Sequence, residues 1–229
     1  MKILVVGGGG REHAIIRALK KSPDCGDIWC APGNGGIGYD ATCKNISATD
    51  VDAMVAFAKA EAFDYVVVAQ DDPLALGMVD ALAKVGIPAF GPDAAAARIE
   101  ASKVFSKDLM KKYGIPTAQY EVFDSAEDAL AYLDSAPIPT VIKADGLALG
   151  KGVIIAATRD EAKEAVVEIM RDKKFGKSGD SIVIEEFLTG PEVSVLSFTD
   201  GKTVVPMVSS MDHKLSLIHI SEPTRHLRI

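Results

Sequence analysis

The start of the chain indicates its fold, because residues 2–13 read KILVVGGGGREH. A short aliphatic run of this kind is typical of a strand that is buried on both faces of a parallel sheet. Four glycines follow it, and the polar residues after them open a helix. Such a glycine loop offers free backbone N–H groups that can hold a phosphate. A tight strand-to-helix turn without a ligand explains the same residues equally well.

The alternation of strand and helix continues to about residue 100. The expected strands are residues 2–6, 28–31, 65–69 and 87–90, and the expected helices are 11–21, 51–62 and 74–85. The first helix should bury Ala14, Ile15, Ala18 and Leu19. Repeated βα units predict an α/β domain, residues 1–101, built on a doubly wound parallel sheet.

From residue 102 the pattern changes to a longer helix and hairpin-like strands, which predicts an α+β domain over residues 102–214. The helix 102–113 should end at Gly114. Two later helices begin with capping-box signatures, Ser125 with Asp128 and Thr158 with Glu161. The expected strands are residues 140–144, 153–157, 182–187, 193–199 and 203–208.

Composition restricts the class of protein. A net charge of −7 argues against a protein that coats nucleic acid, since such proteins carry clustered cations. No signal peptide or membrane span is recognisable, so we expect a cytoplasmic protein. The three cysteines form no C-x-x-C pair and indicate neither a disulfide framework nor a zinc site.

The strongest functional signal is the segment 142–152, which reads IKADGLALGKG. Lys143 lies on a predicted strand, and Lys151 lies in a loop with Gly146, Gly150 and Gly152. Lysines supply positive charge and glycines permit close backbone approach, a combination suited to covering the phosphates of a nucleotide. The spacing does not fit a Walker A loop. The alternative is a hairpin with solvated lysines.

Other polar segments are weaker signals. The glycine turn 31–36 (APGNGG) and the pair Asp71 and Asp72 follow predicted strands, where open α/β sheets bind ligands, although a plain turn and a helix cap explain them too. A dinucleotide fold is disfavoured, because Glu12 stands at its third glycine position and its ribose-binding acid is absent. The acidic exit of strand 182–187, followed by Glu192, could bind an adenosine or simply face solvent.

Together these segments resemble the phosphoribosylamine–glycine ligase family (glycinamide ribonucleotide synthetases), which belongs to the ATP-grasp enzymes. The matching segments are 6–13, 31–36, 71–74, 90–92, 102–105, 143–152, 184–188 and 212–214. The resemblance implies a partial ATP-grasp domain after residue 101. It also implies ATP-dependent ligation of 5-phosphoribosylamine and glycine, with Mg²⁺ or Mn²⁺, in purine biosynthesis. Gln70 stands where the family usually has proline.

Roles follow by position. The resemblance implies that ATP is bound by Lys103, Lys143, Lys151, Gly152, Glu185, Glu186, Phe187, Leu188 and Glu192. It implies that phosphoribosylamine is bound by Gly9, Gly10, Arg11, Glu12, Asn34 and Gly36. It places Lys143, Lys151, Asp212, His213 and Lys214 at the reacting centre. The partners are small molecules, and neither nucleic acid nor a membrane is expected.

The resemblance stops after residue 214, where residues 215–229 read LSLIHISEPTRHLRI and match no segment of the family. The family's magnesium-binding Glu and Asn are not present, so we assign no metal ligand and do not recruit His219 or His226. We therefore expect a truncated chain that is inactive alone. The alternatives are another ATP-grasp carboxylate–amine ligase and a non-catalytic nucleotide-binding fragment.

Overall fold

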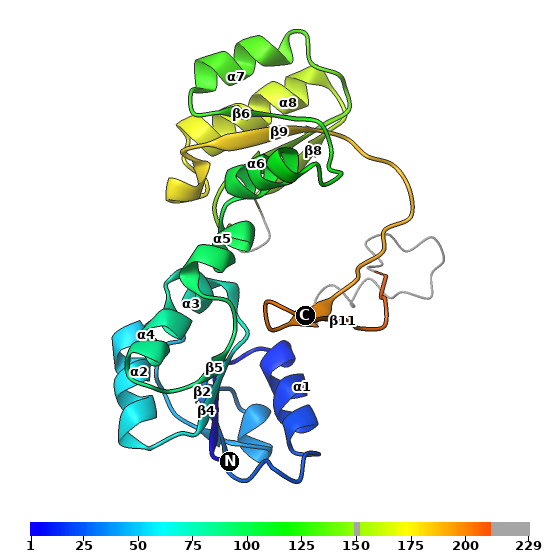
Figure 1. Ribbon diagram of the computed structural model, residues 1–229. Coiled ribbons are helices and arrows are strands. Elements are labelled where there is room, and N and C mark those ends of the chain that lie inside the picture. Colours follow the sequence, from blue (N-terminus) through cyan, green and yellow to red (C-terminus); the bar gives the residue numbers. More distant parts are fainter. Residues whose placement is uncertain (149–151, 212–229) are drawn as a thin grey trace. The chain divides into compact units, whose positions relative to one another are not determined.

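The computed structural model describes residues 1–148 and 152–211 (Figure 1). Residues Met1–Phe187 form one compact unit, and the chain from Leu188 onward forms a second. Within the described residues, no helix is both long and apolar enough to cross a membrane.

The first sheet of the larger unit is parallel, with the strand order β3-β2-β1-β4-β5. Its strands are β1 (Ile3–Gly7), β2 (Ile28–Pro32), β3 (Thr42–Cys43), β4 (Tyr65–Val68) and β5 (Ala89–Phe90). The helical segments between them are α1 (Gly10–Leu19), η1 (Ile37–Tyr39), α2 (Val51–Ala60), α3 (Asp71–Ala75) and α4 (Met78–Lys84). The predicted α/β fold is confirmed.

Strand β1 shows why this sheet is doubly wound. Its five residues are all buried. Alternate side chains point to opposite faces, so Ile3 joins Ile16 of α1 in one cluster, whereas Leu4 joins Met54 of α2 in another. Figure 1 shows α1 on one side of the strands and α2 with α4 on the other.

Two details of the helices differ from the sequence-based expectation. The predicted helix 74–85 is broken by Gly77, whose φ of +81° separates α3 from α4. In α1 the buried residues are Glu12 and Ile16, whereas Ala14 and Ala18 are exposed. Ile15 and Leu19 are partly buried against the cluster of Ile16, so the predicted face is correct for these two residues and wrong for the two alanines.

Helices α5 (Ala94–Ala101) and α6 (Lys103–Tyr113) lead to the second sheet. Ser102 caps α6, since its Oγ accepts a hydrogen bond from the N–H of Phe105 at 3.1 Å. Gly114 ends α6 with a φ of +64°. The predicted helix 102–113 is therefore confirmed, while α5 and the two-residue strand β3 were not predicted.

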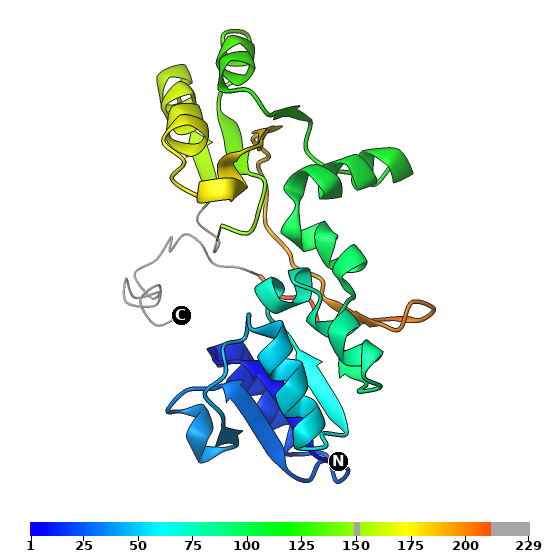
Figure 2. The same ribbon diagram turned by 90° about the vertical axis from the view of Figure 1, so that its left-hand side faces the viewer.

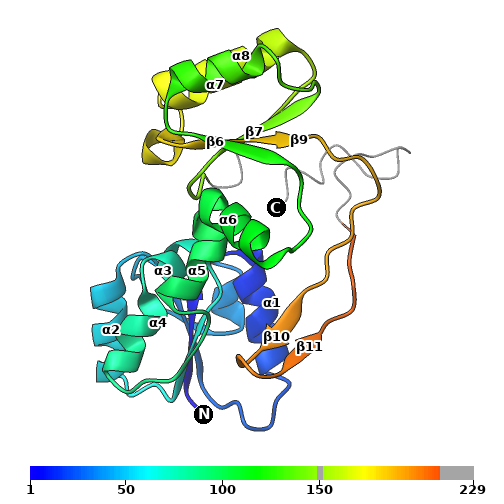
Figure 3. The ribbon, with the colours of Figure 1, turned by 45° about the horizontal axis from the view of Figure 1, so that its top comes forward.

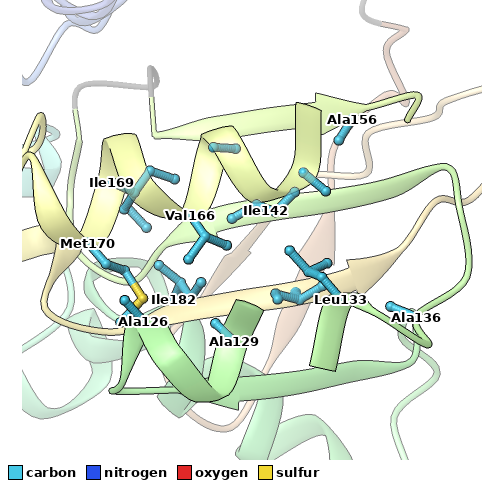
Figure 4. Close-up of a cluster of buried hydrophobic side chains, with 14 residues drawn as sticks. Ala126, Ala129, Leu133, Ala136, Ile142, Ala156, Val166, Ile169, Met170 and Ile182 are labelled. Atoms are coloured by element: carbon cyan, nitrogen blue, oxygen red, sulfur yellow. The ribbon is translucent and has the colours of Figure 1, made fainter. Parts of the chain in front are cut away.

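The second sheet is antiparallel, with the order β6-β9-β7-β8. Its elements are β6 (Tyr120–Phe123), α7 (Ala126–Leu133), β7 (Thr140–Ala144), β8 (Val153–Ala156), α8 (Arg159–Val166), the π-helical turn η2 (Val167–Arg171), η3 (Gly176–Gly179) and β9 (Ile182–Glu186). Figure 2 shows α7 and α8 side by side on one face. Figure 4 shows Leu133, Val166 and Ile169 packed against Ile142 and Ile182 of the strands.

Helix α6 lies on the opposite face of this sheet from α7 and α8 (Figure 3).

The two helices on the other face begin at the predicted capping residues, but only one of them forms the full capping box. Thr158 and Glu161 form the full reciprocal capping box, whereas Ser125 accepts from Asp128 without a return bond. Strand β6 was not predicted, because its residues have no clear alternation.

The described part of the second unit is a hairpin of β10 (Ser197–Thr199) and β11 (Val204–Pro206), extended by a bridge between Ser194 and Ser210. Both strands are shorter than predicted. Their side chains are exposed, including Val204 and Val205. Strand length depends on packing as well as on propensity, and these side chains are not buried by other described residues.

Candidate nucleotide and substrate site

Two glycine loops lie against each other where β1 and β2 end. The N–H of Gly33 donates to the carbonyl of Gly7 at 3.0 Å, and Asn34 Nδ2 donates to the carbonyl of Gly8 at 2.6 Å. A Cβ atom on Gly8 would lie 2.7 Å from the carbonyl oxygen of Gly33. Glycine is therefore required here for the close approach of two backbones.

Both ends of the Asn34 amide make hydrogen bonds within these loops. Besides the bond to Gly8, its Oδ1 accepts from the N–H of Ile37 at 2.8 Å. Asn34 therefore fixes the loop 33–37, while the residue itself is exposed and its amide keeps a second N–H. The direct contact between Asn34 and phosphoribosylamine stays a prediction.

Glu12 lies beneath the first glycine loop and is 2% exposed. Its Oε2 accepts from the N–H of Gly9 at 2.6 Å, and a Cβ on Gly7 would lie 2.7 Å from its Cγ. The carboxylate therefore holds the loop from inside and takes up one of the N–H groups that a phosphate could use. Gly10 has open space around it, and Arg11 is exposed.

A cavity of about 430 Å³ in the larger unit is lined by residues of α1, α3, α5, α6 and the segment between β7 and β8, with the first residue of β8. It is lined by Arg11, Asp71, Asp72, Glu100, Lys103, Leu147, Ala148, Gly152 and Val153. Arg11, Lys103 and Gly152 are predicted site residues that the fold brings together. Asp71 and Asp72 line the cavity and form the first turn of α3. Gln70 holds the N-cap position, so neither aspartate caps this helix.

Lys103 is held at the wall of this cavity by the start of the loop 145–148. Its Nζ donates to the carbonyl of Gly146 at 3.0 Å. The Asp145 carboxylate accepts from the N–H of Val104 at 2.8 Å and from Ser102 Oγ at 3.0 Å. Burial lowers the pKa of Lys103 and the charge of Lys143 adds to this effect, while the Asp145 and Glu100 carboxylates oppose it. An anion in the cavity would favour the charged form.

Lys143 is a partly exposed member of a group of charges on the α6 side of the second sheet, whose other members are buried. Its Nζ lies 2.8 Å from Glu185 Oε2, and Lys107 Nζ lies 3.2 Å from the same oxygen. Glu185 and Lys107 are each 6% exposed. Sequence reasoning missed Lys107. The available signal was a lysine four positions after Lys103, on the same face of α6.

The side chain of Glu185 makes its contacts within the fold, and the binding of adenosine by residues 185–188 stays a prediction. Its carboxylate is bound to lysines, and its backbone carbonyl accepts from Thr140 Oγ1 at 2.8 Å. The N–H of Glu186 donates to the carbonyl of Gln119 at 2.9 Å. The side chain of Phe187 is exposed, and so are those of Leu188 and Glu192 in the second unit.

The remaining predicted residues are placed as follows. Gly152 is buried, and a Cβ on it would lie 2.6 Å from the Cβ of Ala148. Lys151, Asp212, His213 and Lys214 lie outside the described residues. Within residues 1–148 and 152–211, no three His, Cys, Asp or Glu side chains are grouped to hold a metal ion.

Comparison with known proteins covers nearly the whole chain. Residues 1–100 match the family model of the phosphoribosylglycinamide synthetase N domain, and residues 101–218 match that of its ATP-grasp (A) domain. A phosphoribosylamine–glycine ligase of Allochromatium vinosum is 47% identical over 93% of the chain and 50% of the relative. One from Pasteurella multocida is 48% identical with the same coverage. The chain spans about half the length of the curated relatives it matches.

Solved structures agree with this fold. A phosphoribosylamine–glycine ligase from Thermotoga maritima superposes with a TM-score of 0.73 at 31% identity, covering 90% of this chain and 49% of that one. A biotin carboxylase from Campylobacter jejuni, solved as a β,γ-ATP complex, gives a TM-score of 0.72 at 19% identity, covering 90% and 49%. At that identity the second match concerns the fold alone.

Proposed function

Because the chain belongs to the phosphoribosylglycinamide synthetase family, we propose that it forms the substrate domain and part of the nucleotide site of a carbon–nitrogen ligase. The reaction joins 5-phosphoribosylamine to glycine with ATP, as the names of its relatives state for those proteins. The proposed products are glycinamide ribonucleotide, ADP and phosphate, in purine biosynthesis.

The chemistry requires activation of a carboxylate. An amine does not displace oxide from a glycine carboxylate, so ATP supplies a phosphoryl group that turns this oxygen into a leaving group. Positive charge near the transferring phosphoryl lowers the barrier. The chain offers Lys103 and Lys143 for this purpose, and Lys151 is proposed to join them from the segment 145–152.

One observation carries the nucleotide half of the proposal. Lys103 lines the cavity together with Gly152, and its Nζ donates to the carbonyl of Gly146 at 3.0 Å, at the start of the loop into which β7, the strand of Lys143, leads. A polyanion in this cavity would lie beside the Lys103 ammonium group and would offset the cost of burying part of that cation. The backbone of residues 185–188 and Glu192 are proposed to hold the adenosine, and Asp212, His213 and Lys214 are proposed to act at the reacting centre.

The acceptor half rests on the glycine loops and Arg11. The loops present backbone N–H groups at the start of α1, and Arg11 lines the adjoining cavity, a combination suited to the phosphate of phosphoribosylamine. Mg²⁺ or Mn²⁺ is expected for the reaction. We assign no step to the ion, because the described residues provide no ligand group for it.

Calorimetry with a nonhydrolysable ATP analogue tests the nucleotide half. We expect binding by the parent chain and a loss of tenfold or more in affinity for Lys103→Met and Lys143→Met. Lys84→Met is the matched control, because Lys84 is an exposed lysine on α4 and its loss changes the net charge equally. Equal binding by all four proteins would refute the assignment of the two lysines.

Ribose 5-phosphate, a stable stand-in for the sugar phosphate, tests the acceptor half. Arg11→Met should weaken its binding about tenfold, whereas Arg17→Met, which removes an exposed arginine from the same helix, should not. If both variants bind as the parent does, the proposed phosphate site is not at this loop.

A further inference from the structure

The two lysines that contact Glu185 are not equivalent. Both ammonium groups are directed at Oε2, and Oε1 is buried without a hydrogen-bond partner in the described structure. The side chain of Lys107 is 7% exposed, whereas that of Lys143 is 27% exposed. One lysine is therefore enclosed, and the other has access to solvent and ligands.

Lys107 is fixed by further contacts. Its Nζ donates to Thr117 Oγ1 at 2.8 Å and lies 3.4 Å from the carbonyl of Ala118. The ring of Tyr120 lies 5.5 Å from the same nitrogen. Lys143, by contrast, has the Glu185 carboxylate as its hydrogen-bond partner in the described structure. The geometry allows Lys143 to leave Glu185, while Lys107 is bound on several sides.

A departure of Lys143 has an electrostatic cost. A buried carboxylate that loses its counter-ion is strongly destabilised and takes up a proton instead. The charged and titratable groups around Glu185 are Lys103 and Lys107 of α6, Lys143 of β7, Tyr120 of β6 in register with it, and Glu186 beside it. Of these, Lys107 is the enclosed cation in direct contact.

We propose that Lys107 is a positioning residue whose ammonium group keeps Glu185 ionised when Lys143 turns from Glu185 to the phosphates of a nucleotide. This inference rests on the proposed function of Lys143. Lys107 touches neither nucleotide nor substrate. It allows Lys143 to alternate between two anions without a proton being taken up at Glu185.

The first test needs no nucleotide. Lys143→Met mimics the departure of Lys143, and the carbon-13 signal of the Glu185 carboxyl group, identified with Glu185→Gln, reports its ionisation. At pH 7 we expect an ionised carboxylate in Lys143→Met, a protonated one in Lys107→Met/Lys143→Met, and an ionised one again in Lys107→Arg/Lys143→Met. An ionised Glu185 in the double methionine variant would overturn the proposal.

The second test measures protons directly. Calorimetry of ATP-analogue binding in buffers with different ionisation enthalpies gives the number of protons taken up. At pH 7 we expect Lys107→Met to take up about one proton per nucleotide more than the parent does, and Lys107→Arg to take up the same number as the parent. A purely structural role would weaken binding without changing this number, and equal proton numbers in all three would contradict the proposal.

The two tests separate the possible failures. If the parent chain does not bind the analogue, the proposed nucleotide function fails, and the carboxyl signal still decides the role of Lys107. If the double methionine variant does not fold, as judged by its amide spectrum, Lys107→Gln/Lys143→Met replaces it, because glutamine keeps a donor near Thr117 without the charge. An ionised Glu185 in that variant would equally overturn the proposal.

Discussion

The two sheets of the larger unit place polar groups in different ways. The parallel sheet is covered on both faces, and its candidate site residues lie in loops at the ends of β1, β2 and β4. The antiparallel sheet is covered by α7 and α8 on one face, and on the other it carries Lys143 and Glu185 within the strands. A sheet that is buried on both faces leaves room for ligands at strand ends, whereas a partly covered face can hold charges along a strand.

The difference in coverage between the two sheets should have its largest effect on the unfolding free energy of core substitutions. Ile3 and Leu4 face opposite sides of the parallel sheet and are both buried, so Ile3→Ala and Leu4→Ala should each cost about 2–5 kcal/mol of unfolding free energy. Ile155 of β8 is 61% exposed, and Ile155→Ala should change stability by less than about 0.5 kcal/mol. Urea unfolding measures all three. A loss of unfolding free energy for Ile3→Ala as small as that for Ile155→Ala would mean that α1 does not cover this face of the parallel sheet.

Replacement of glycine by alanine in the glycine loops should give the next largest change in stability. Gly7 has a φ of +130° and no room for a Cβ beside Glu12, so Gly7→Ala should cost about 1–3 kcal/mol. Gly10 opens α1 with nothing within 4 Å, and Gly10→Ala should be neutral or stabilising by up to about 1 kcal/mol. Thermal melting distinguishes them. Similar losses in both variants would show that the loop is not held by Glu12.

Substitutions at the start of α6 should reduce stability less than substitutions in the glycine loops. Ser102→Ala removes the N-cap bond to Phe105 and a donor to the Asp145 carboxylate, and it should cost about 1 kcal/mol. Ser106→Ala, inside the same helix, should have little effect. Chemical denaturation of both variants decides whether the cap, rather than helix propensity, sets the stability of this end.

Asp40, near the glycine loops, should give the smallest and most pH-dependent effect. Hydrogen bonds from Lys20 and His13 lower the pKa of Asp40 from 3.8 to about 2. Because this pKa is lower in the folded state, its stabilising contribution is present above about pH 4 and is lost as the pH falls through about 2. Asp40→Asn should therefore be less stable than the parent at pH 6, with a difference that shrinks towards pH 2. A difference that is constant with pH would exclude the ion pairs as its cause.

Short-range features could be read from the sequence. Ser102 and Gly114 delimit α6, Thr158 and Glu161 form the expected capping box, and the aliphatic runs at β1, β7 and β9 are strands. Each depends on residues within four positions or on a strong local pattern. The break at Gly77 could not be read in this way, because a glycine inside a helical pattern is compatible with both a continuous and a broken helix.

The candidate site was predictable as a set of residues but not as a geometry. The motifs pointed to Arg11, Lys103, Lys143 and Gly152, and the fold places Arg11, Lys103 and Gly152 around one cavity. They did not show that the side chains of Glu12 and Asn34 are used to hold loops, or that Glu185 is enclosed by two lysines.

The amino-acid sequence by itself determined the order of the elements, the α/β character of the first domain and the chemical types available for binding a polyphosphate. Local propensity, capping and hydrophobic periodicity act between near neighbours in the chain and are therefore visible in it. The tertiary structure alone decided which charges meet: Lys107 and Lys143 share one oxygen of Glu185 because α6, β7 and β9 converge. Burial, which gives such contacts their energy, is a property of that convergence.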